Sequence, residues 1–443
     1  MKLKTFKPGG VHLHDQKHYT ASFPLEIMPD PEVVVIPLSQ HIGLPAKALV
    51  AKGDKVFMGQ MIAEAQGGFS VPVHSSVSGT VDALGPFPHP VHGTSEAIRI
   101  ISDGKSEWQN KSSDAKTSSR LFSSEELLHI IQNAGIVGMG GATFPTHIKL
   151  SPPKEHPVDI LIINGAECEP YLTCDHRIML EKTDTLLEGI SILTDLLKIK
   201  TIYIGIEENK KDCIEHLNQR ILALSSENKP IVCALKEKYP QGAEKSLILA
   251  CTGRTVPIGK LPYHVGLMVQ NVATVVAIAE AVQLKKPLIE RALTVTGDLV
   301  RNPKNLWVRI GTPVQKVIDY CGGLISEPEK VILGGPMMGL AQRSLDVPVT
   351  KGVSGILLMS NSSFQKETAC IRCGQCIINC PSGLMPLRIK ELSQKQEYEK
   401  AKQYHALSCI ECGICSYQCP AYIPLLNYIR NAKTEINKRS RKS

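Results

Sequence analysis

The chain has 443 residues, more than one hydrophobic core usually organises, so its length alone predicts about three domains. Apolar residues make up 43% and charged residues 21% of the chain, a balance that excludes a wholly disordered protein. The formal net charge of +8 is modest for this length, and we expect no nucleic-acid partner.

Neither a membrane-spanning helix nor a secretory signal is expected. The most apolar stretch, residues 265–284, is interrupted by Gln270, Asn271 and Glu280, whereas a spanning helix needs about 20 apolar residues in a row. The lysines near the N-terminus are not followed by an apolar run. We therefore expect a protein of the cytoplasm.

Residues 1–104 contain short runs of alternating apolar and polar residues, which predict a small β domain. Within it, residues 51–65 and 73–84 resemble the two halves of a biotinyl or lipoyl domain, a barrel-sandwich hybrid. The carrier lysine of such domains is missing, because residues 66–69 between the two halves read Gln-Gly-Gly-Phe. We expect this barrel to serve in docking.

Residues 105–122 are polar and rich in serine, and they read as a linker. Ser123 and Glu126 then form a capping box that begins a helix, and Gly135 is placed to end it. Strand-like and helix-like runs alternate through residues 123–286, which predicts a Rossmann-like α/β domain with a mostly parallel sheet. The expected strands are 158–164, 201–206 and 231–235, and the expected helices lie near 184–197 and 210–224.

The pattern changes after Pro287. Residues 287–362 combine short strands, Gly and Pro turns and one helix, and they resemble a β-grasp domain of the soluble-ligand-binding (SLBB) kind. A cysteine-rich module follows at 363–432, and the basic residues of 433–443 form a tail that we expect to be solvated. The alternative for this tail is contact with an acidic partner or a membrane surface. The predicted fold is therefore a multidomain mixture of α/β and α+β units.

Eight of the 14 cysteines form two identical motifs, C-x2-C-x2-C-x3-C-P. This is the run of bacterial two-cluster ferredoxins, in which three thiolates bind one [4Fe-4S] cluster and the fourth binds the other. Zinc, the alternative, takes paired C-x2-C units and does not need four cysteines in each run. The predicted ligand sets are Cys370, Cys373, Cys376 with Cys419, and Cys409, Cys412, Cys415 with Cys380.

A second constellation lies in the predicted α/β domain. A glycine-rich loop at 138–141 follows the capped helix, and Asn164, Glu167 and Glu169 follow the first strand, at the edge where open α/β sheets bind ligands. Residues 239–245 follow another strand, and residues 269–274 open a helix with free backbone donors. By themselves the glycines are also compatible with a simple turn, and the carboxylates with a solvated acidic loop.

The segments GIVGMGGATFPTHIK, NGAECEP, YPQGAEK and VQNVAT resemble the loops of the NADH- and FMN-binding flavoprotein subunit of respiratory complex I. From Phe6 to Ala432 the chain resembles the RnfC family, which belongs to Rnf ferredoxin:NAD oxidoreductase complexes. The resemblance implies that the FMN phosphate and ribityl chain are held by Gly138, Gly140, Gly141, Lys149, Asn271 and Thr274. It implies that the flavin ring is surrounded by Asn164, Glu167, Tyr239, Gly242 and Glu244.

The same resemblance places Phe144 and Glu169 on the nicotinamide nucleotide side, and it makes Glu244 and Glu169 the candidate catalytic residues. Four positions depart from the complex I pattern, so the ring and nucleotide contacts are less strongly implied than the phosphate loop. These positions are Leu150, Ala166, Ala243 and Gln270.

The resemblance implies hydride exchange between NAD(H) and FMN, followed by one-electron transfer through the two clusters. It also implies a peripheral position on the cytoplasmic face of the bacterial inner membrane. The implied partners are the membrane subunits of the Rnf complex and its ferredoxin-type iron-sulfur subunit. Two alternatives remain open, a cobalamin reductase of bacterial microcompartments and a non-enzymatic protein for electron relay or docking.

Overall fold

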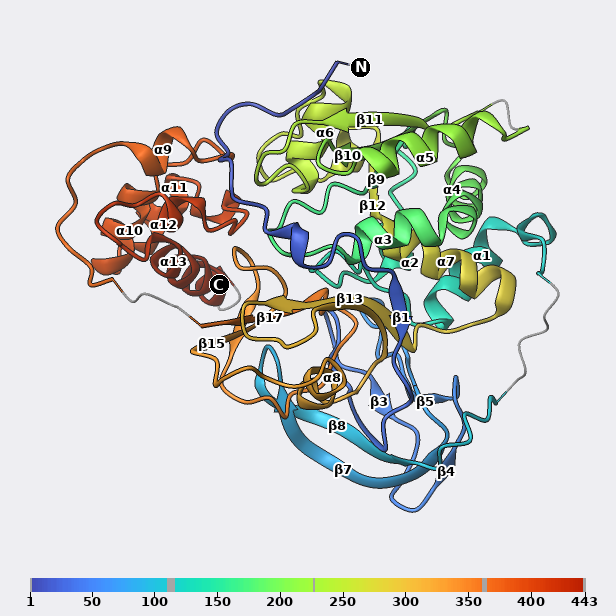
Figure 1. Cartoon of the computed structure of the whole chain (residues 1–443). Helices are drawn as coiled ribbons and strands as arrows, with labels where there is room; N and C mark the ends of the chain where they lie inside the picture. Colours follow the sequence, from blue (N-terminus) through green and yellow to red (C-terminus); the bar gives the residue numbers. More distant parts are fainter. Residues whose placement is uncertain (1, 110–115, 226–227, 361–364, 441–443) are drawn as a thin grey trace.

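The computed structural model describes residues 2–109, 116–225, 228–360 and 365–440. Figure 1 shows an α/β body and a helical C-terminal module side by side, with a β-sheet below the body and the N-terminal barrel beneath that sheet. Within the described ranges, no helix combines the length and the apolar character needed to cross a membrane.

The barrel consists of two small sheets packed face to face. One has the strand order β2-β8-β7-β4 and the other β3-β5-β6. Their inward side chains, among them Val34, Ile36 and Ile62, form a buried core. The bounds are β2 Val33–Pro37, β3 Lys47–Ala48, β4 Lys55–Val56, β5 Met61–Glu64, β6 Val73–His74, β7 Gly79–His89 and β8 Gly93–Ser102.

The residues before β2, which we expected to belong to the barrel, lie along the other modules instead. We call residues 4–27 the N-terminal strap. Lys4 pairs with Leu235 at the edge of the α/β sheet, Val11 pairs with Tyr239, and strand β1 (Leu25–Ile27) pairs in parallel with β14. Edge strands expose backbone N–H and C=O groups without partners, and the backbone of the strap provides hydrogen-bonding partners for some of them.

The strap also inserts a buried lysine into the α/β body. Lys17, in the short helix η1 (Lys17–Tyr19), donates to the carbonyl oxygens of Glu167, Glu169 and Leu172 at 2.9, 3.0 and 2.5 Å. Burial lowers the pKa of Lys17, and the nearby Lys210 lowers it further. The ammonium therefore depends on these three carbonyl groups for the hydrogen bonds that water would otherwise supply.

The α/β body contains a parallel four-stranded sheet with the order β11-β10-β9-β12, as the alternating pattern predicted. The capping box of Ser123 and Glu126 is present, and Gly135 follows helix α1 with a φ of +67°. Helix α3 (Cys174–Glu181) was not expected from the sequence. The strands are β9 Ile160–Asn164, β10 Thr201–Glu207, β11 Ile231–Leu235 and β12 Leu267–Asn271.

Helices cover both faces of this sheet and form the largest hydrophobic core of the chain. The helices are α1 Ser124–Asn133, α2 Thr146–Lys149, α3 Cys174–Glu181, α4 Thr183–Leu197, α5 Lys211–Leu222, α6 Glu244–Thr252 and α7 Val272–Leu284, with short helices η2 Ser119–Leu121 and η3 Pro262–Val265. Part of the expected linker is anchored, because the Trp108 ring packs on Gly59 of the barrel. Residues 110–115 of that linker lie outside the described residues.

The β-grasp module is a six-stranded mixed sheet with the order β1-β14-β13-β17-β15-β16 and one helix. Its Lys351 is buried where three modules meet, donating to the carbonyl oxygens of Gly135 at 2.7 Å and Pro72 at 3.3 Å. Burial lowers the pKa of Lys351 to about 7. The elements are β13 Glu290–Gly297, β14 Lys304–Arg309, α8 Val314–Tyr320, β15 Lys330–Leu333, β16 Leu340–Gln342 and β17 Gly355–Met359.

The cysteine-rich module is a small helical unit with its own core. The segment between the cysteine runs contains two helices, separated near Gln396, which has a φ of +57°. The expected solvated tail instead continues the last helix, and its Ile436 is fully buried. The helices are α9 Gln375–Ile378, α10 Pro386–Gln394, α11 Tyr398–Gln403, η4 Ala406–Ser408, α12 Ile414–Tyr417 and α13 Leu425–Ser440.

Replacing Lys17 by methionine is expected to destabilise the folded chain. Three buried carbonyl groups would lose a charged donor, and hydrogen bonds to charged groups contribute about 1.5–3 kcal/mol each, partly offset by the removal of a buried charge. We expect the free energy of unfolding to fall by about 2–4 kcal/mol, measured by denaturant titration under anaerobic conditions. Lys47→Met on the exposed barrel surface is the control, and equal stability of the two variants would contradict the role of Lys17.

Candidate functional site

The polar loops after the strands of the α/β sheet converge at one edge. Strands β9 and β12 are parallel neighbours in which Asn164 lies directly beside Asn271. The loop that contains Tyr239 and Gly242 follows β11 and leaves the sheet at the same edge, since all four strands run parallel. The amide of Asn164 donates to the carbonyl of Gly242 at 2.9 Å, so two of the predicted ring neighbours are in direct contact.

The glycine-rich loop closes on itself and is fixed to the start of helix α7. The Gly138 amide donates to the Phe144 carbonyl at 2.9 Å, and the Met139 amide donates to the Thr274 hydroxyl at 2.9 Å. Asn271 caps α7 by accepting from the Ala273 amide at 2.9 Å. The loop is thereby held at the N-terminus of a 13-residue helix, where backbone donors favour an anion such as a phosphate.

The glycines of this loop leave room above the helix end. A Cβ on Gly140 would lie 3.3 Å from Cβ of Asn271, and a Cβ on Gly141 would meet no atom within 4 Å. Gly141 also has a φ of +112°, which side chains rarely adopt. Close backbone approach and open space at a helix N-terminus fit an FMN phosphate in this cradle, with Thr274 and Asn271 already part of it.

Lys149 and Glu244, predicted for different parts of the flavin, form an ion pair with the ammonium 2.7 Å from the carboxylate. Both side chains are about one third exposed, at 30% and 35%. Glu244 is the first residue of helix α6, where a negative charge is favoured by the helix dipole. The pair can therefore offer one cation and one anion to a ligand without a large desolvation cost.

Glu167 uses both carboxylate oxygens to cap helix α3, accepting from the amides of Asp175 at 2.8 Å and His176 at 3.2 Å. Asp175 was not predicted from the sequence, yet its carboxylate accepts from the Asn271 amide at 2.6 Å. Burial and the charge of Glu167 raise the pKa of Asp175 to about 7. Asp175 thus joins two predicted flavin residues, and no motif spacing marks it.

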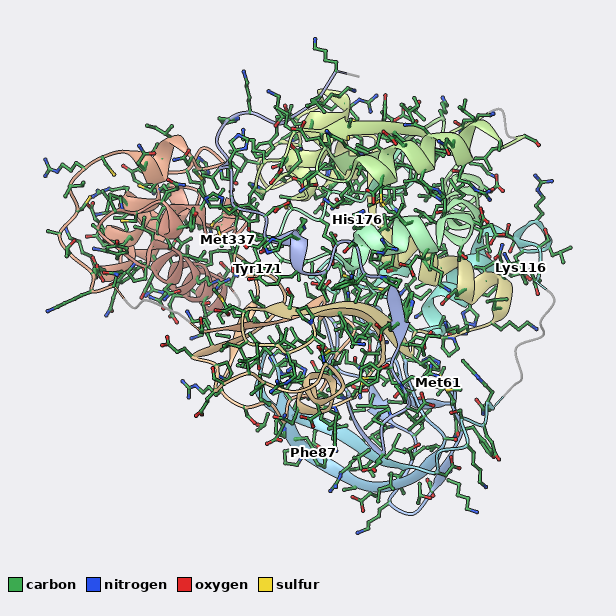
Figure 2. The ribbon with its side chains drawn as sticks, in the orientation of Figure 1. Met61, Phe87, Lys116, Tyr171, His176 and Met337 are labelled. Carbon is green, nitrogen blue, oxygen red and sulfur yellow. The ribbon has the colours of Figure 1, made fainter. Side chains whose placement is uncertain are left out.

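Glu169 and Tyr239 lie at the border with the other modules. The Glu169 carboxylate accepts from the amides of Met337 and Met338 at 3.0 and 2.8 Å, in residues 334–339 of the β-grasp module. Figure 2 shows Met337 on the side of that module that faces the cysteine-rich module. Burial raises the pKa of Glu169 to about 6, although these two donors act against the shift. The Tyr239 hydroxyl donates to the carbonyl of Cys412 at 2.9 Å and so reaches the cysteine-rich module.

Phe144 lies against the barrel, on a different side from Glu169. Its ring meets the ring of Phe69 edge-on, with centroids 6.0 Å apart, and Phe69 occupies the hairpin where a carrier lysine would stand in a biotinyl domain. The two residues expected on the nicotinamide nucleotide side are therefore supported by different modules.

Cys380 joins the second cysteine run. Together with Cys409, Cys412 and Cys415 it lines a cavity whose remaining walls are mostly apolar, including Ile414 and Leu426. Backbone amides of the loops point at sulfur, with Leu384 donating to Cys380 at 3.3 Å and Glu411 donating to Cys409 at 3.4 Å. Four thiols around a largely apolar cavity, with backbone amides that donate to their sulfur atoms, fit a [4Fe-4S] cluster.

The first run is closer to solvent. Cys370 and Cys373 are exposed, and Cys376 is half-buried. Burial raises the pKa of Cys376, and the neighbouring Cys373 and Cys419 raise it further, so Cys419 lies with the first run. The structure thus places Cys380 with the second run and Cys419 beside Cys376 of the first run.

The strap passes directly beside Cys380, a contact that was not predicted from the sequence. The Gly10 amide donates to the carbonyl of Asn379 at 3.0 Å. A Cβ on Gly9 would lie 2.6 Å from the carbonyl carbon of Cys380, and Gly9 has a φ of +68°. Only glycine allows this approach, so the Gly-Gly pair of the strap was the available signal.

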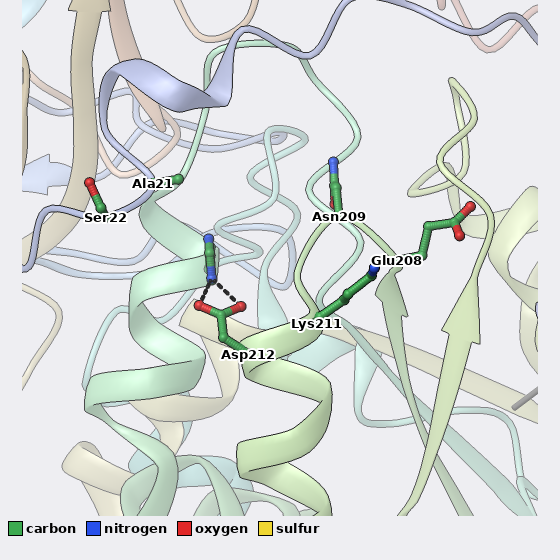
Figure 3. A pocket seen from close by; sticks show the side chains of 7 residues that line it. Ala21, Ser22, Glu208, Asn209, Lys211 and Asp212 are labelled. Atoms are coloured by element: carbon green, nitrogen blue, oxygen red, sulfur yellow. Dashed lines mark hydrogen bonds and ion pairs between the residues drawn. The ribbon is translucent and has the colours of Figure 1, made fainter.

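A cavity of about 400 Å³ opens beside helix α3, away from the predicted residues (Figure 3). Its wall includes His176, whose Nε2 lies 2.9 Å from both carboxylate oxygens of Asp212. Burial lowers the pKa of His176, and Asp212 acts in the opposite direction. The other wall residues are Ala21, Ser22, Glu208, Asn209 and Lys211.

Four family models match successive parts of the chain. They are described as the RnfC barrel sandwich hybrid domain (residues 4–105), the Nuo51 FMN-binding domain (131–280), the SLBB domain (293–341) and the 4Fe-4S dicluster domain (369–423). These matches confirm the expected fold class and the expected FMN-binding and iron-sulfur domains.

Curated relatives match the chain along its whole length. The C component of the proton-translocating ferredoxin:NAD(+) oxidoreductase complex of Clostridium ljungdahlii is 49% identical over 98% of this chain and 94% of its own. The C component of the Na(+)-translocating ferredoxin:NAD(+) oxidoreductase complex of Acetobacterium woodii is 46% identical over 100% of this chain and 99% of its own.

Among solved structures, the NAD+-reducing [NiFe]-hydrogenase in the air-oxidized state is similar with a TM-score of 0.50 at 16% identity. The likeness covers 73% of this chain and 63% of that chain, less than two thirds. It supports the fold alone.

Single cysteine replacements test whether the fourth cysteine of each run binds the cluster of the other run. Cys380→Ala and Cys412→Ala are expected to remove the same cluster, because both residues line the same cavity, and Cys376→Ala is expected to remove the other. Electron paramagnetic resonance of anaerobically purified, reduced protein distinguishes the two signals. Cys321→Ala, a buried cysteine of the β-grasp module, should retain both. If Cys380→Ala lost the same signal as Cys376→Ala, the assignment of Cys380 to the cluster of the second run would be wrong.

Proposed function

The chain belongs to the RnfC family of ion-translocating ferredoxin:NAD(+) oxidoreductase complexes, and we propose that it exchanges hydride with NAD(H) and passes single electrons onward. The observation that carries the proposal is the contact of Tyr239 with Cys412. It joins the loop edge of the α/β sheet to a predicted cluster ligand within hydrogen-bond distance, at 2.9 Å. Hydride chemistry and one-electron chemistry thereby meet inside one chain.

The resident cofactors would supply the redox chemistry, since FMN takes up two electrons together and releases them one at a time. The residues of the chain would bind these cofactors and orient them. In this proposal the FMN phosphate and ribityl chain lie against Gly138, Gly140, Gly141, Lys149, Asn271 and Thr274. The ring lies near Asn164, Glu167, Tyr239, Gly242 and Glu244, and the nicotinamide nucleotide lies near Phe144 and Glu169.

The two cysteine sets differ in their place along the electron path. The set of Cys380 with Cys409, Cys412 and Cys415 is the inner one, because Tyr239 and the strap contact it. The set of Cys370, Cys373, Cys376 and Cys419 is the outer one, because its first two members are exposed. We propose that electrons enter the inner cluster and leave through the outer cluster to a partner.

The proposed partners are the membrane subunits of such a complex and its ferredoxin-type iron-sulfur subunit. Both named relatives are components of an ion-translocating complex, which supports a peripheral position at the cytoplasmic face of the bacterial inner membrane. The proposed units are the strap and the barrel to residue 104, the linker to 122, the FMN and NADH unit to 286, the β-grasp unit to 362 and the cluster unit beyond. The identity along the whole chain disfavours a cobalamin reductase.

Anaerobic purification with iron and flavin determination tests this function directly. We expect about eight irons and one FMN per chain, and NADH-dependent reduction of an artificial electron acceptor. Bound zinc, or clusters without flavin, would refute the mechanism. Clusters and flavin without NADH turnover would favour the non-enzymatic relay.

Replacing Glu244 by alanine is expected to lower the rate of NADH oxidation by about 10-fold to 100-fold, because a charged group at the site is lost while Lys149 stays unpaired. The visible and paramagnetic signals of the clusters should not change. Glu215→Ala, an exposed glutamate on helix α5, is the matched control. Unchanged turnover in the Glu244 variant would remove this residue from the site.

A further inference from the structure

Two carboxyl groups lie close together beside the proposed flavin cradle. The side-chain oxygens of Glu167 and Asp175 are within 4.8 Å of each other and of the Cys174 sulfur. Glu167 accepts two backbone amides at the N-terminus of helix α3, at 2.8 and 3.2 Å. Both of its oxygens therefore accept hydrogen bonds from the backbone.

Asp175 is in a different position. One oxygen of its half-buried carboxyl group accepts the Asn271 amide at 2.6 Å, and the group lies within 4.8 Å of Glu167. Burial and, after it, the charge of Glu167 raise the pKa of Asp175 to about 7, so Asp175 carries a proton at pH 6.

The other charged neighbours come from separate elements. Arg291 of strand β13 and Lys17 of the strap favour the ionised form of Asp175, but less strongly than burial and Glu167 disfavour it. Burial raises the pKa of Cys174 well above its ordinary value, so this thiol stays neutral. His176 follows Asp175 on α3 but is paired with Asp212 on helix α5.

Asp175 is connected to the proposed cofactor site on two sides. The Asn271 side chain that donates to Asp175 caps helix α7 and lies 3.3 Å from the Cβ position of Gly140, on the side where the proposed function puts the FMN phosphate. On the other side, the carboxyl group of Asp175 lies within 4.8 Å of that of Glu167, which the proposed function puts beside the flavin ring.

We propose that Asp175, held next to Glu167, stores the proton that accompanies the reduction of the flavin. The inference rests on the proposed function and adds a proton-holding residue to it. Full reduction of a flavin takes up one hydride from NADH and one proton, which Asp175 releases. Solvent then returns a proton to Asp175. Reoxidation of the flavin by two single-electron transfers to the clusters releases two protons.

The test follows the flavin absorbance and the proton uptake together after rapid mixing of the holoprotein with NADH, in weakly buffered solution with a pH indicator, during the first phase in which the flavin is reduced and the cluster absorbance has not yet changed. At pH 6 the flavin should be reduced before the indicator reports proton uptake, because the proton comes first from Asp175. Above pH 7 the rate of flavin reduction should fall by about tenfold for each pH unit, as the protonated fraction of one carboxyl group does. Simultaneous proton uptake at pH 6, or a rate independent of pH, would overturn the proposal.

In Asp175→Asn, proton uptake at pH 6 should no longer lag behind flavin reduction, and the rate of flavin reduction should no longer fall above pH 7. The new amide oxygen can still accept from Asn271. Asp212→Asn is the matched control, because it removes the carboxyl group on helix α5 that pairs with His176 of α3. This variant should behave like the wild type. If this variant lost the pH dependence and Asp175→Asn kept it, the His176 pair would be the proton store.

Time-resolved infrared spectra of the wild type give a second readout that does not depend on a variant. At pH 6 the band of a protonated carboxyl group must lose intensity as the flavin is reduced and recover as the indicator reports proton uptake. A band that stays constant throughout would refute the role of Asp175.

These outcomes separate from failure of the proposed function. Protein that binds FMN and is reduced by NADH, but shows neither the delay nor the pH dependence, contradicts only the role of Asp175. Protein that is not reduced by NADH contradicts the proposed function itself.

Discussion

The buried ammonium of Lys17 is the interaction on which the arrangement of the site depends. It binds three carbonyl oxygens in the segment that carries Glu167 and Glu169. Lys210 binds the carbonyl of Ala166 in the same segment at 2.7 Å. Burying two cations is costly, and the cost is offset only when the carbonyl groups are held in place. The loop and the lysines therefore stabilise each other's position.

This constraint has consequences for the neighbouring modules. The strap that supplies Lys17 also contacts the cysteine-rich module at Gly9 and Gly10, and it pairs with the β-grasp sheet through β1. Glu169, at the end of the held segment, binds the amides of Met337 and Met338. The contacts of several modules thus converge on one loop. Electron transfer falls steeply with distance, so a fixed separation between redox sites requires this kind of rigid connection.

Electrostatics differ between the two ends of the site. At the glycine loop, the N-terminus of α7 and Lys149 present positive potential to an anion. Beside it, Glu167, Asp175 and Glu169 contribute three half-buried carboxyl groups, and burial raises the pKa of the latter two. A site that must bind a phosphate and also exchange protons near neutral pH needs both kinds of group.

Local patterns in the sequence determined much of this protein. The two cysteine runs, the capping box of Ser123 and the strands around β10 follow from spacing and periodicity, because their causes lie within a few residues. Tertiary structure alone decided the strap, the Tyr239 contact with Cys412 and the link from Asp175 to Asn271. Those last two contacts join residues 173 and 96 positions apart, and no local propensity encodes such pairings. They arise when separate modules pack and each buried polar group must find a partner.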